Sequence, residues 1–250
     1  GAYEALSVMD VDAIDDLGNS DLVGTELAVS VLLSSVARRN ICPNFVITRG
    51  VFTCQHEPPA PFWGSRDEAA PSGTSYDEQN AETSHVPKPD QFGNYQYIRM
   101  ELCQHGDMEE FIKNHPEKNL ATGDCRNLLF QMAFALHVIS DRFGLKHYDV
   151  KLLNFFLQSA KDPTIADGEH PHVVLRYGVG SHVFRLRMHP SSAHIAKLAD
   201  YGTSVMRTDS DGQPVSLSNF TTLENTPPDF LILGNAAEQG YGHDCFGLGL

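Results

Sequence analysis

The sequence lacks the features that mark secreted and membrane-spanning proteins. It contains no apolar run of the roughly 18 residues that a membrane helix needs, so we expect no transmembrane span. Its N-terminus is acidic and has no basic segment ahead of an apolar one, which excludes a signal peptide. The five cysteines are scattered without a C-x-x-C pair, as in proteins that keep their thiols reduced. We therefore expect an intracellular protein, cytoplasmic or nuclear, or a viral one, and not a secreted one.

Positive charge is also scarce. The chain has 18 basic and 32 acidic residues and a formal net charge of −14. A surface of this sign repels nucleic acid and anionic membranes, so neither is expected as a partner. A small-molecule site is not excluded, because a few local charges decide binding there. With 250 residues, of which 41% are hydrophobic, the chain is long enough for one large domain or for two lobes around a cleft.

The first hundred residues predict one long helix and several strands. Apolar spacing predicts a helix over residues 25–39, with Thr25 as its cap and Glu26 in its first turn, where the helix dipole favours an anion. Residues 44–54 and 95–102 are rich in β-branched and aromatic residues and predict strands. The first is either one strand with a kink at Gly50 or two short strands. Residues 55–93 carry many prolines among polar residues and are expected to form an inserted loop.

The second half predicts longer helices and a hairpin. Asp124 is expected to cap a helix over residues 125–142, which Gly144 would end. Residues 173–187 predict a β-hairpin, and residues 155–157 and 194–198 predict short strands, with Lys197 facing solvent on the last of them. Residues 244–250 read as the start of a buried helix. Together these elements predict an α+β fold.

A dense polar loop lies between apolar flanks at residues 145–157. It places Asp149, Lys151 and Asn154 within six residues, and Asp200 follows a later strand. The oxygen atoms of Asn154 and Asp200 are hard ligands suited to Mg²⁺, which usually takes only one or two protein carboxylates. Asp149 would then be free to orient a hydroxyl nucleophile, and Lys151 would neutralise charge on a phosphoryl group in transfer. A solvated loop with incidental charges is the plainer alternative.

These motifs resemble those of eukaryotic-type protein kinases. The run H-Y-D-V-K-L-L-N at residues 147–154 is similar to their catalytic loop, H-R-D-x-K-x-x-N, and Asp200-Tyr201-Gly202 is similar to D-F-G. A lysine two positions after the aspartate is typical of serine/threonine kinases. The run T-P-P-D at residues 226–229 resembles A-P-E, and Asp244 resembles the aspartate that opens a buried helix. The amino-acid sequence around the loop is also similar to that of divergent kinase-like proteins of large DNA viruses and protists.

The resemblance implies further site residues. Glu26 would be the glutamate of the family's helix C, and Asp107 would be an acidic residue that binds ribose. Met100, Glu101 and Cys103 would form the gatekeeper and hinge, where backbone atoms bind adenine. ATP and Mg²⁺ are the implied cofactors, and the implied partner is a protein substrate with a Ser or Thr hydroxyl. The implied fold is a bilobal protein-kinase-like fold with a partial N-lobe and a truncated helical C-lobe.

Several family features are missing from the sequence. No Gly-rich loop precedes Glu26, and the first lysine, Lys88, lies in the proline-rich insert, so the lysine that pairs with the helix-C glutamate has no candidate. Either those strands lie outside this sequence or they have degenerated, and the end in a helix favours an excerpt of a longer chain. Tyr148 stands where many kinases have an arginine, which predicts weaker dependence on activation-segment phosphorylation. Asp229 is one methylene shorter than the family's glutamate, which puts its usual ion pair in doubt.

The sequence as a whole favours one function over three others. We expect residues 1–102 to form the partial N-lobe and residues 103–250 the C-lobe, with a hairpin insert at 159–193 and an activation segment at 200–229. The expected activity is ATP-dependent phosphoryl transfer to Ser/Thr hydroxyls of proteins. The alternatives are a pseudokinase that binds nucleotide or acts as a scaffold, a small-molecule or lipid kinase of related fold, and a purely structural protein.

Overall fold

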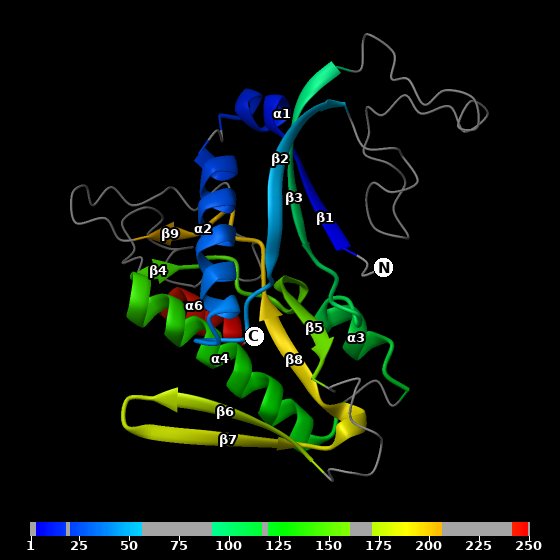
Figure 1. Cartoon of the computed structure of the whole chain (residues 1–250), viewed down its shortest axis with the longest axis vertical. Helices are drawn as coiled ribbons and strands as arrows, with labels where there is room; N and C mark the ends of the chain where they lie inside the picture. The colour runs from blue at the N-terminus through cyan, green and yellow to red at the C-terminus, as the bar shows by residue number, and fades with distance from the viewer. Residues whose placement is uncertain are drawn as a thin grey trace.

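A computed structural model describes residues 4–18, 21–56, 92–116, 120–160, 172–206 and 242–249. These residues form a mixed helix-and-strand structure in two parts (Figure 1). One part is a three-stranded sheet with a long helix beside it. The other part contains most of the remaining helices and three two-stranded sheets. The α+β class expected from the sequence is confirmed. The proline-rich insert, apart from its ends, and the activation segment beyond residue 206 lie outside the described residues.

The larger sheet contains a strand that sequence patterning missed. Its order is β1-β3-β2, formed by β1 (Glu4–Asp10), β2 (Thr48–His56) and β3 (Phe92–Glu101), and both pairings are antiparallel. The sequence showed only weak patterning in residues 1–20, because β1 is an edge strand with no fully buried residue. A register shift in β2 between Thr48 and Gly50 accounts for the kink expected there.

The long helix beside this sheet is α2 (Asp21–Arg38), and it is preceded by the short helix α1 (Val11–Asp16). The expected cap at Thr25 is wrong, because α2 begins four residues earlier and Thr25 lies within it. The buried face of α2 includes Val29, Leu33 and Val36. Ser34 lies on this face too, and its hydroxyl donates a hydrogen bond of 3.1 Å to the carbonyl of Thr48, which ties α2 to the start of β2.

The second part is organised around α4 (Thr122–Phe143), with α3 (Met108–Lys113) and α6 (Gly242–Gly249) nearby. The expected cap at Asp124 is wrong: Asp124 lies in the first turn of α4, and its carboxylate accepts a hydrogen bond from the Ser192 hydroxyl. Gly144 ends the helix with a φ of 58°, as the sequence predicted, because this left-handed conformation costs glycine little.

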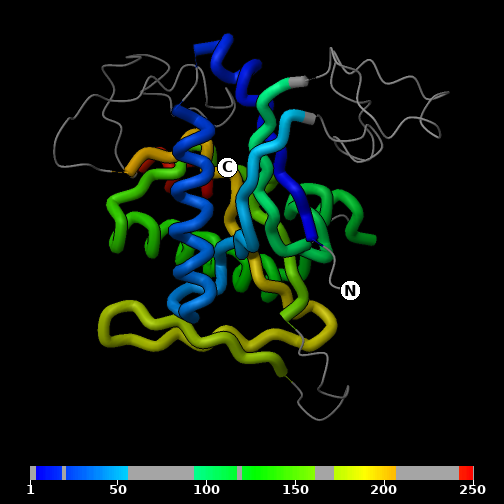
Figure 2. The backbone as a smooth tube through the Cα atoms, turned by 45° about the horizontal axis from the view of Figure 1, so that its top comes forward, coloured from blue at the N-terminus to red at the C-terminus, as the bar shows by residue number. Residues whose placement is uncertain are grey.

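Three small antiparallel sheets complete this part. Strand β4 (Leu145–Lys146) pairs with β9 (Val205–Met206), and β5 (Phe155–Ser159) pairs with β8 (His194–Leu198). The expected hairpin is confirmed as β6 (Val173–Val179) with β7 (His182–Met188). Figures 1 and 2 both show the hairpin running along α4 at one edge of the molecule. No helix among the described residues is long and apolar enough to cross a membrane.

A buried polar network joins the two parts. The segment between α2 and β2 lies alongside β8, where the Leu198 amide donates to the Asn44 carbonyl at 2.9 Å. The Asn44 side-chain amide donates to Gln131 Oε1 on α4 at 3.0 Å and to the Ala196 carbonyl at 2.7 Å. Both side chains are fully buried, so each of these hydrogen bonds satisfies a group that would otherwise be costly to bury. The largest hydrophobic cluster surrounds this network, with α2, α4, β5 and β8 contributing to it.

Candidate functional site

The polar loop, residues 147–154, is held in place by a buried carboxylate of α6. Asp244 accepts hydrogen bonds from the backbone amides of His147 and Tyr148, each at 2.8 Å. Tyr148 has a φ of 66°, which is uncommon for a residue other than glycine and costs conformational energy. The neighbouring backbone of Val150 lies so close to α6 that a Cβ on Gly247 would come within 2.6 Å of its carbonyl oxygen. The loop conformation therefore depends on α6 being packed against it.

Within the loop, Asp149, Lys151 and Asn154 converge on one point. The Asn154 side-chain amide donates to Asp149 Oδ2 at 3.0 Å and to the Asp149 carbonyl at 2.9 Å. Lys151 Nζ lies 2.7 Å from the same Oδ2 atom. The Asp149 side chain is 7% exposed and that of Lys151 is 26% exposed. The arrangement thus fixes a carboxylate and an ammonium group side by side at the edge of the buried region.

The segment with Asp200 and Tyr201 is fastened to the same loop. The His147 ring lies 3.2 Å from the Ala199 carbonyl through its Nε2 atom, and the Thr203 hydroxyl donates to the His147 carbonyl at 2.9 Å. The Tyr201 hydroxyl donates to the Leu198 carbonyl at 2.5 Å. Asp200 itself is exposed and has a φ of 64°. The structure therefore presents the Asp200 carboxylate to solvent from a segment whose neighbours on both sides are buried.

Glu26 lies on the α2 side of this segment. Its carboxylate accepts hydrogen bonds from the Tyr201 amide and, at 3.1 Å, from the Ser30 hydroxyl. A Cβ added to Gly202 would lie 3.9 Å from Glu26 Oε2 and 4.0 Å from Asp200 Oδ1, so Gly202 separates two carboxylates. Burial, and next the charge of Asp200, raises the pKa of Glu26 to about 7. Among the described residues, no lysine or arginine forms an ion pair with Glu26.

Lys197 is the residue that the sequence placed wrongly. It was expected to face solvent on its strand, but it is 5% exposed and its Nζ lies 2.6 Å from Glu101 Oε1. The same Glu101 oxygen accepts the Ile47 amide at 2.8 Å. Both side chains of this ion pair are buried, and they link β8 to the end of β3. Strand alternation failed here because the consecutive residues Ala196, Lys197 and Leu198 are all buried, so both faces of this part of β8 are covered.

The other residues assigned to nucleotide binding have local structural roles. Asp107 caps α3 by accepting the Glu110 amide at 2.8 Å. The Cys103 side chain is buried with Val46 and Ala199, and burial raises the pKa of its thiol to about 12. Met100 is partly buried and packs against the same cluster. The adenine contact expected from the backbone of Cys103 stays a prediction.

The structure therefore gathers the predicted residues, apart from Asp107 at the start of α3, into three groups. Asp149, Lys151 and Asn154 contact one another. Glu26 and Asp200 lie on either side of Gly202. Glu101, Cys103 and Met100 follow one another at the end of β3, close to Lys197. No set of three or more His, Cys, Asp or Glu side chains suited to a metal ion occurs among the described residues, so any cation here would depend on few protein ligands.

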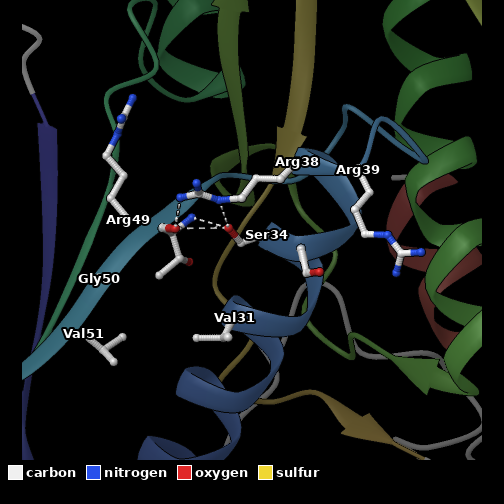
Figure 3. A pocket seen from close by; sticks show the side chains of 9 residues that line it. Val31, Ser34, Arg38, Arg39, Arg49, Gly50 and Val51 are labelled. Carbon is white, nitrogen blue, oxygen red and sulfur yellow. Dashed lines mark hydrogen bonds between the residues drawn. The ribbon is translucent and has the colours of Figure 1, made fainter.

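A separate hollow lies between α2 and β2 (Figure 3). Its volume is about 350 Å³, and none of the predicted site residues lines it. Arg38 spans it, because its guanidinium donates to the Thr48 carbonyl at 2.7 Å and to the Ser34 hydroxyl at 3.3 Å. This guanidinium is therefore engaged in joining α2 to β2.

Comparison with known proteins gives one partial similarity. No protein-family model matches the chain. Over 74 residues it is 31% identical to the serine/threonine-protein kinase PLK4 of Xenopus tropicalis. The matched stretch is 30% of this chain and 8% of the length of that relative. Over that stretch, the chain is similar to a serine/threonine-protein kinase.

Proposed function

We propose that this protein transfers the γ-phosphoryl group of ATP to Ser or Thr hydroxyls of a protein substrate. The observation that carries the proposal is the geometry around Asp149. The Asp149 carboxylate is held by the Asn154 side-chain amide at 3.0 Å and by the Lys151 ammonium group at 2.7 Å, so a carboxylate and a cation are fixed side by side. A substrate hydroxyl that donates to this carboxylate would be oriented for attack on phosphorus, and the carboxylate would receive its proton.

Lys151 supplies the positive charge that the reaction requires. Its ammonium group is held beside Asp149 and is partly exposed, so a phosphoryl group could approach it from solvent. Negative charge that develops on the transferring group would be stabilised there. The lysine also places a positive charge 2.7 Å from the buried Asp149 side chain. A lipid or small-molecule kinase is less well supported, because the similarity that was found is to a serine/threonine-protein kinase.

The donor set fits a magnesium ion. The Asn154 side-chain amide donates both of its described hydrogen bonds through Nδ2, which leaves the carbonyl oxygen Oδ1 as a possible ligand. Asp200 contributes an exposed carboxylate. Hard oxygen donors of this number suit Mg²⁺, which retains several waters and takes further oxygens from phosphate groups. Asn154 and Asp200 would hold the ion, and when bound it would supply charge neutralisation for the phosphates.

The proposal places ATP between the two parts of the molecule, in a bilobal kinase-like arrangement. The sheet with α2 would be the smaller lobe, and the part around α4 would be the larger one. The backbone of Glu101 and Cys103, where β3 leads into the second part, would bind adenine. The Lys197–Glu101 ion pair supports this placement, since it fixes the end of β3 against β8 three residues before Asp200.

A pseudokinase is the second candidate, and Glu26 is the observation that favours it. In the resemblance on which the proposal rests, this glutamate pairs with a lysine that binds phosphate. Here the Glu26 carboxylate accepts the Tyr201 amide and the Ser30 hydroxyl and has no cationic partner among the described residues. A protein of this kind would keep the fold and bind nucleotide, or act as a scaffold, without phosphoryl transfer.

Turnover of Mg·ATP with a generic Ser/Thr protein substrate distinguishes these candidates. We expect the unmodified chain to phosphorylate the substrate, and Asp149→Asn to lower kcat by about 10²-fold or more, because the hydroxyl proton loses its acceptor. The matched control is Asp141→Asn, which removes an exposed carboxylate from α4 and should leave turnover unchanged. Binding of Mg·ATP is measured in parallel by calorimetry.

Each outcome decides between the candidates. Turnover that depends on Asp149 supports phosphoryl transfer. Nucleotide binding without turnover supports the pseudokinase. Absence of both binding and turnover overturns both, and turnover that survives Asp149→Asn removes the proposed role of this carboxylate.

A further inference from the structure

The hairpin β6–β7 has a charge composition unlike that of the rest of the chain. Residues 170–199 contain no Asp or Glu, whereas the whole sequence has 32 acidic residues among 250. The two strands carry three arginines, Arg176, Arg185 and Arg187. A run of 30 residues without an acid is uncommon in a chain with a net charge of −14. The hairpin is therefore a positive element on an acidic protein.

All three arginines lie on one face of the hairpin. Arg176 is directly opposite Arg185, and Arg187 is opposite Val174. These residues are exposed, whereas the residues between them in sequence, such as Leu175 and Leu186, are partly buried. Because side chains alternate along a strand, the arginines project together from the outward face. Two exposed valines lie at its ends, Val174 with 44% and Val183 with 64% exposure.

The opposite face fixes the hairpin to α4. The Tyr177 ring lies 4.8 Å from that of Phe134 and 5.4 Å from that of Phe130, measured between centroids. The Phe184 ring lies 5.4 Å from that of Phe130. Tyr177 is 2% exposed and Met188 is 3% exposed. This packing holds the outward face in a defined position on the helix, so the arginines form a pre-organised surface.

Nothing that the structure describes neutralises these charges. None of the three guanidinium groups forms an ion pair or side-chain hydrogen bond with another described residue. Like charges directly opposite each other in an antiparallel pair destabilise a hairpin. Arg176 and Arg185 form such a pair. An arrangement that weakens the free hairpin is explained if a ligand of opposite charge compensates for it.

We propose that the outward face of β6–β7 is a docking surface for an acidic, extended polypeptide segment of a partner protein. The proposal goes beyond the phosphoryl transfer proposed above and does not depend on it. Carboxylates at alternate positions of an extended chain repeat every 7 Å or so, which matches the repeat of Arg185 and Arg187 along their strand. Apolar side chains of the segment would contact Val174 and Val183 at the ends of the arginine cluster.

The same observations disfavour nucleic acid as the ligand. A polynucleotide needs a longer track of positive charge than three arginines, and the net charge of −14 would repel its phosphates. Nucleic-acid backbones also offer no aliphatic side chains for the exposed valines. A short acidic peptide segment satisfies both the charge and the apolar part of the surface.

Fluorescence anisotropy with a labelled peptide tests the proposal. The probe is an extended peptide in which Glu and Val alternate over about eight residues, and its neutral counterpart has Gln in place of Glu. We expect the Glu peptide to bind the full chain, with an affinity that falls as salt rises from about 50 to about 300 mM. Arg176→Gln combined with Arg185→Gln should weaken binding about fivefold or more.

The matched control is Arg39→Gln combined with Arg142→Gln, which removes the same charge from two exposed positions, one directly after α2 and one in the last turn of α4. Binding to this control should equal binding to the unmodified chain. Equal loss in both double variants would mean that net charge alone governs binding, and it would overturn the proposal. So would equal binding of the neutral peptide, or no binding of the Glu peptide.

Two further measurements identify other occupants of the face. An oligonucleotide of about twelve nucleotides that binds more tightly than the peptide, and through the same arginines, would replace the polypeptide as the ligand. Sedimentation velocity detects a second copy of this chain: self-association that is lost in Arg176→Gln/Arg185→Gln would assign the face to dimer formation instead. Circular dichroism confirms that both double variants remain folded.

Discussion

Two buried glutamates on either side of the candidate site differ in how their charge is compensated. Glu101 is 7% exposed and lies 2.6 Å from the Lys197 ammonium group. Glu26 is 8% exposed and faces the Tyr201 amide, the Ser30 hydroxyl and the negative charge of Asp200. Burial raises the pKa of Glu26 to about 7, because hydrogen bonds alone do not offset the loss of hydration. The two glutamates are equally buried, and what differs between them is the partner. Glu101 has a lysine beside it, whereas Glu26 has, among the described residues, only hydrogen-bond donors.

The difference between Glu26 and Glu101 matters for function as well as for stability. The Lys197–Glu101 pair is a buried contact of 2.6 Å that links β8 to the end of β3. Glu26 changes its charge near neutral pH, next to the segment that presents Asp200. A cation bound close to Glu26 would favour the ionised form of its carboxylate. The charge of Glu26, on the α2 side of the site, would therefore respond to a cation bound beside it.

The largest effect is expected when the Lys197–Glu101 ion pair is broken. Lys197→Met removes the ammonium group and leaves Glu101 buried without a counter-charge, which should lower the free energy of unfolding by about 3–5 kcal/mol. Urea unfolding followed by circular dichroism measures the loss. The double variant Lys197→Met/Glu101→Gln is the control, because Gln keeps an acceptor for the Ile47 amide and carries no charge. It should recover most of the stability, whereas equal loss in both variants would contradict a charge effect.

The sequence predicted the polar loop well because its information is local. Asp149, Lys151 and Asn154 lie within six residues, and a loop that short brings them together once its backbone is fixed. The hairpin β6–β7 and the helix α4 were predicted for a similar reason, since alternation and helical spacing are properties of single segments. The roles proposed for these residues in phosphoryl transfer remain predictions that activity measurements must test.

Other features depended on contacts between distant segments. Lys197 and Glu101 are 96 residues apart, and alternation along β8 could not show that both faces of this strand are covered. Strand β1 has no strongly apolar pattern and is recognisable only through its pairing with β3. Asp244 was assigned to a buried helix by resemblance, but its hydrogen bonds to the His147 and Tyr148 amides link positions nearly a hundred residues apart.

A smaller effect, an increase in the free energy of unfolding, is expected when the charge of Glu26 is removed. The folded-state pKa of Glu26 is raised from 4.5 to about 7, so the folded state holds a proton that the unfolded chain has lost between these values. Stability from this group is therefore present at low pH and falls as pH rises from about 4.5 to about 7. Glu26→Gln removes the titration and should stabilise the protein by about 2 kcal/mol near pH 8, with little change near pH 5.

Urea unfolding at the two pH values measures this difference. The control is Glu110→Gln, which neutralises an exposed glutamate on α3 and should leave the difference between the two pH values as it is in the unmodified chain. If Glu26→Gln has the same effect at both pH values, Glu26 does not titrate in this range and the contrast with Glu101 is wrong. If it destabilises at both, the carboxylate makes a contact that Gln cannot replace.

The smallest effect is expected when one of the hydrogen bonds to the Glu26 carboxylate is removed. Ser30 donates to Glu26 Oε1 at 3.1 Å and thereby lowers the pKa that burial raises. Ser30→Ala should raise this pKa further and cost about 1 kcal/mol near pH 8, where the carboxylate is ionised, and less near pH 5, where it is protonated. Ser35→Ala, at an exposed position on the same helix, should show no such pH dependence. A loss of equal size at both pH values would show that Ser30 contributes by packing, and the hydroxyl would then have no part in setting the charge beside Asp200.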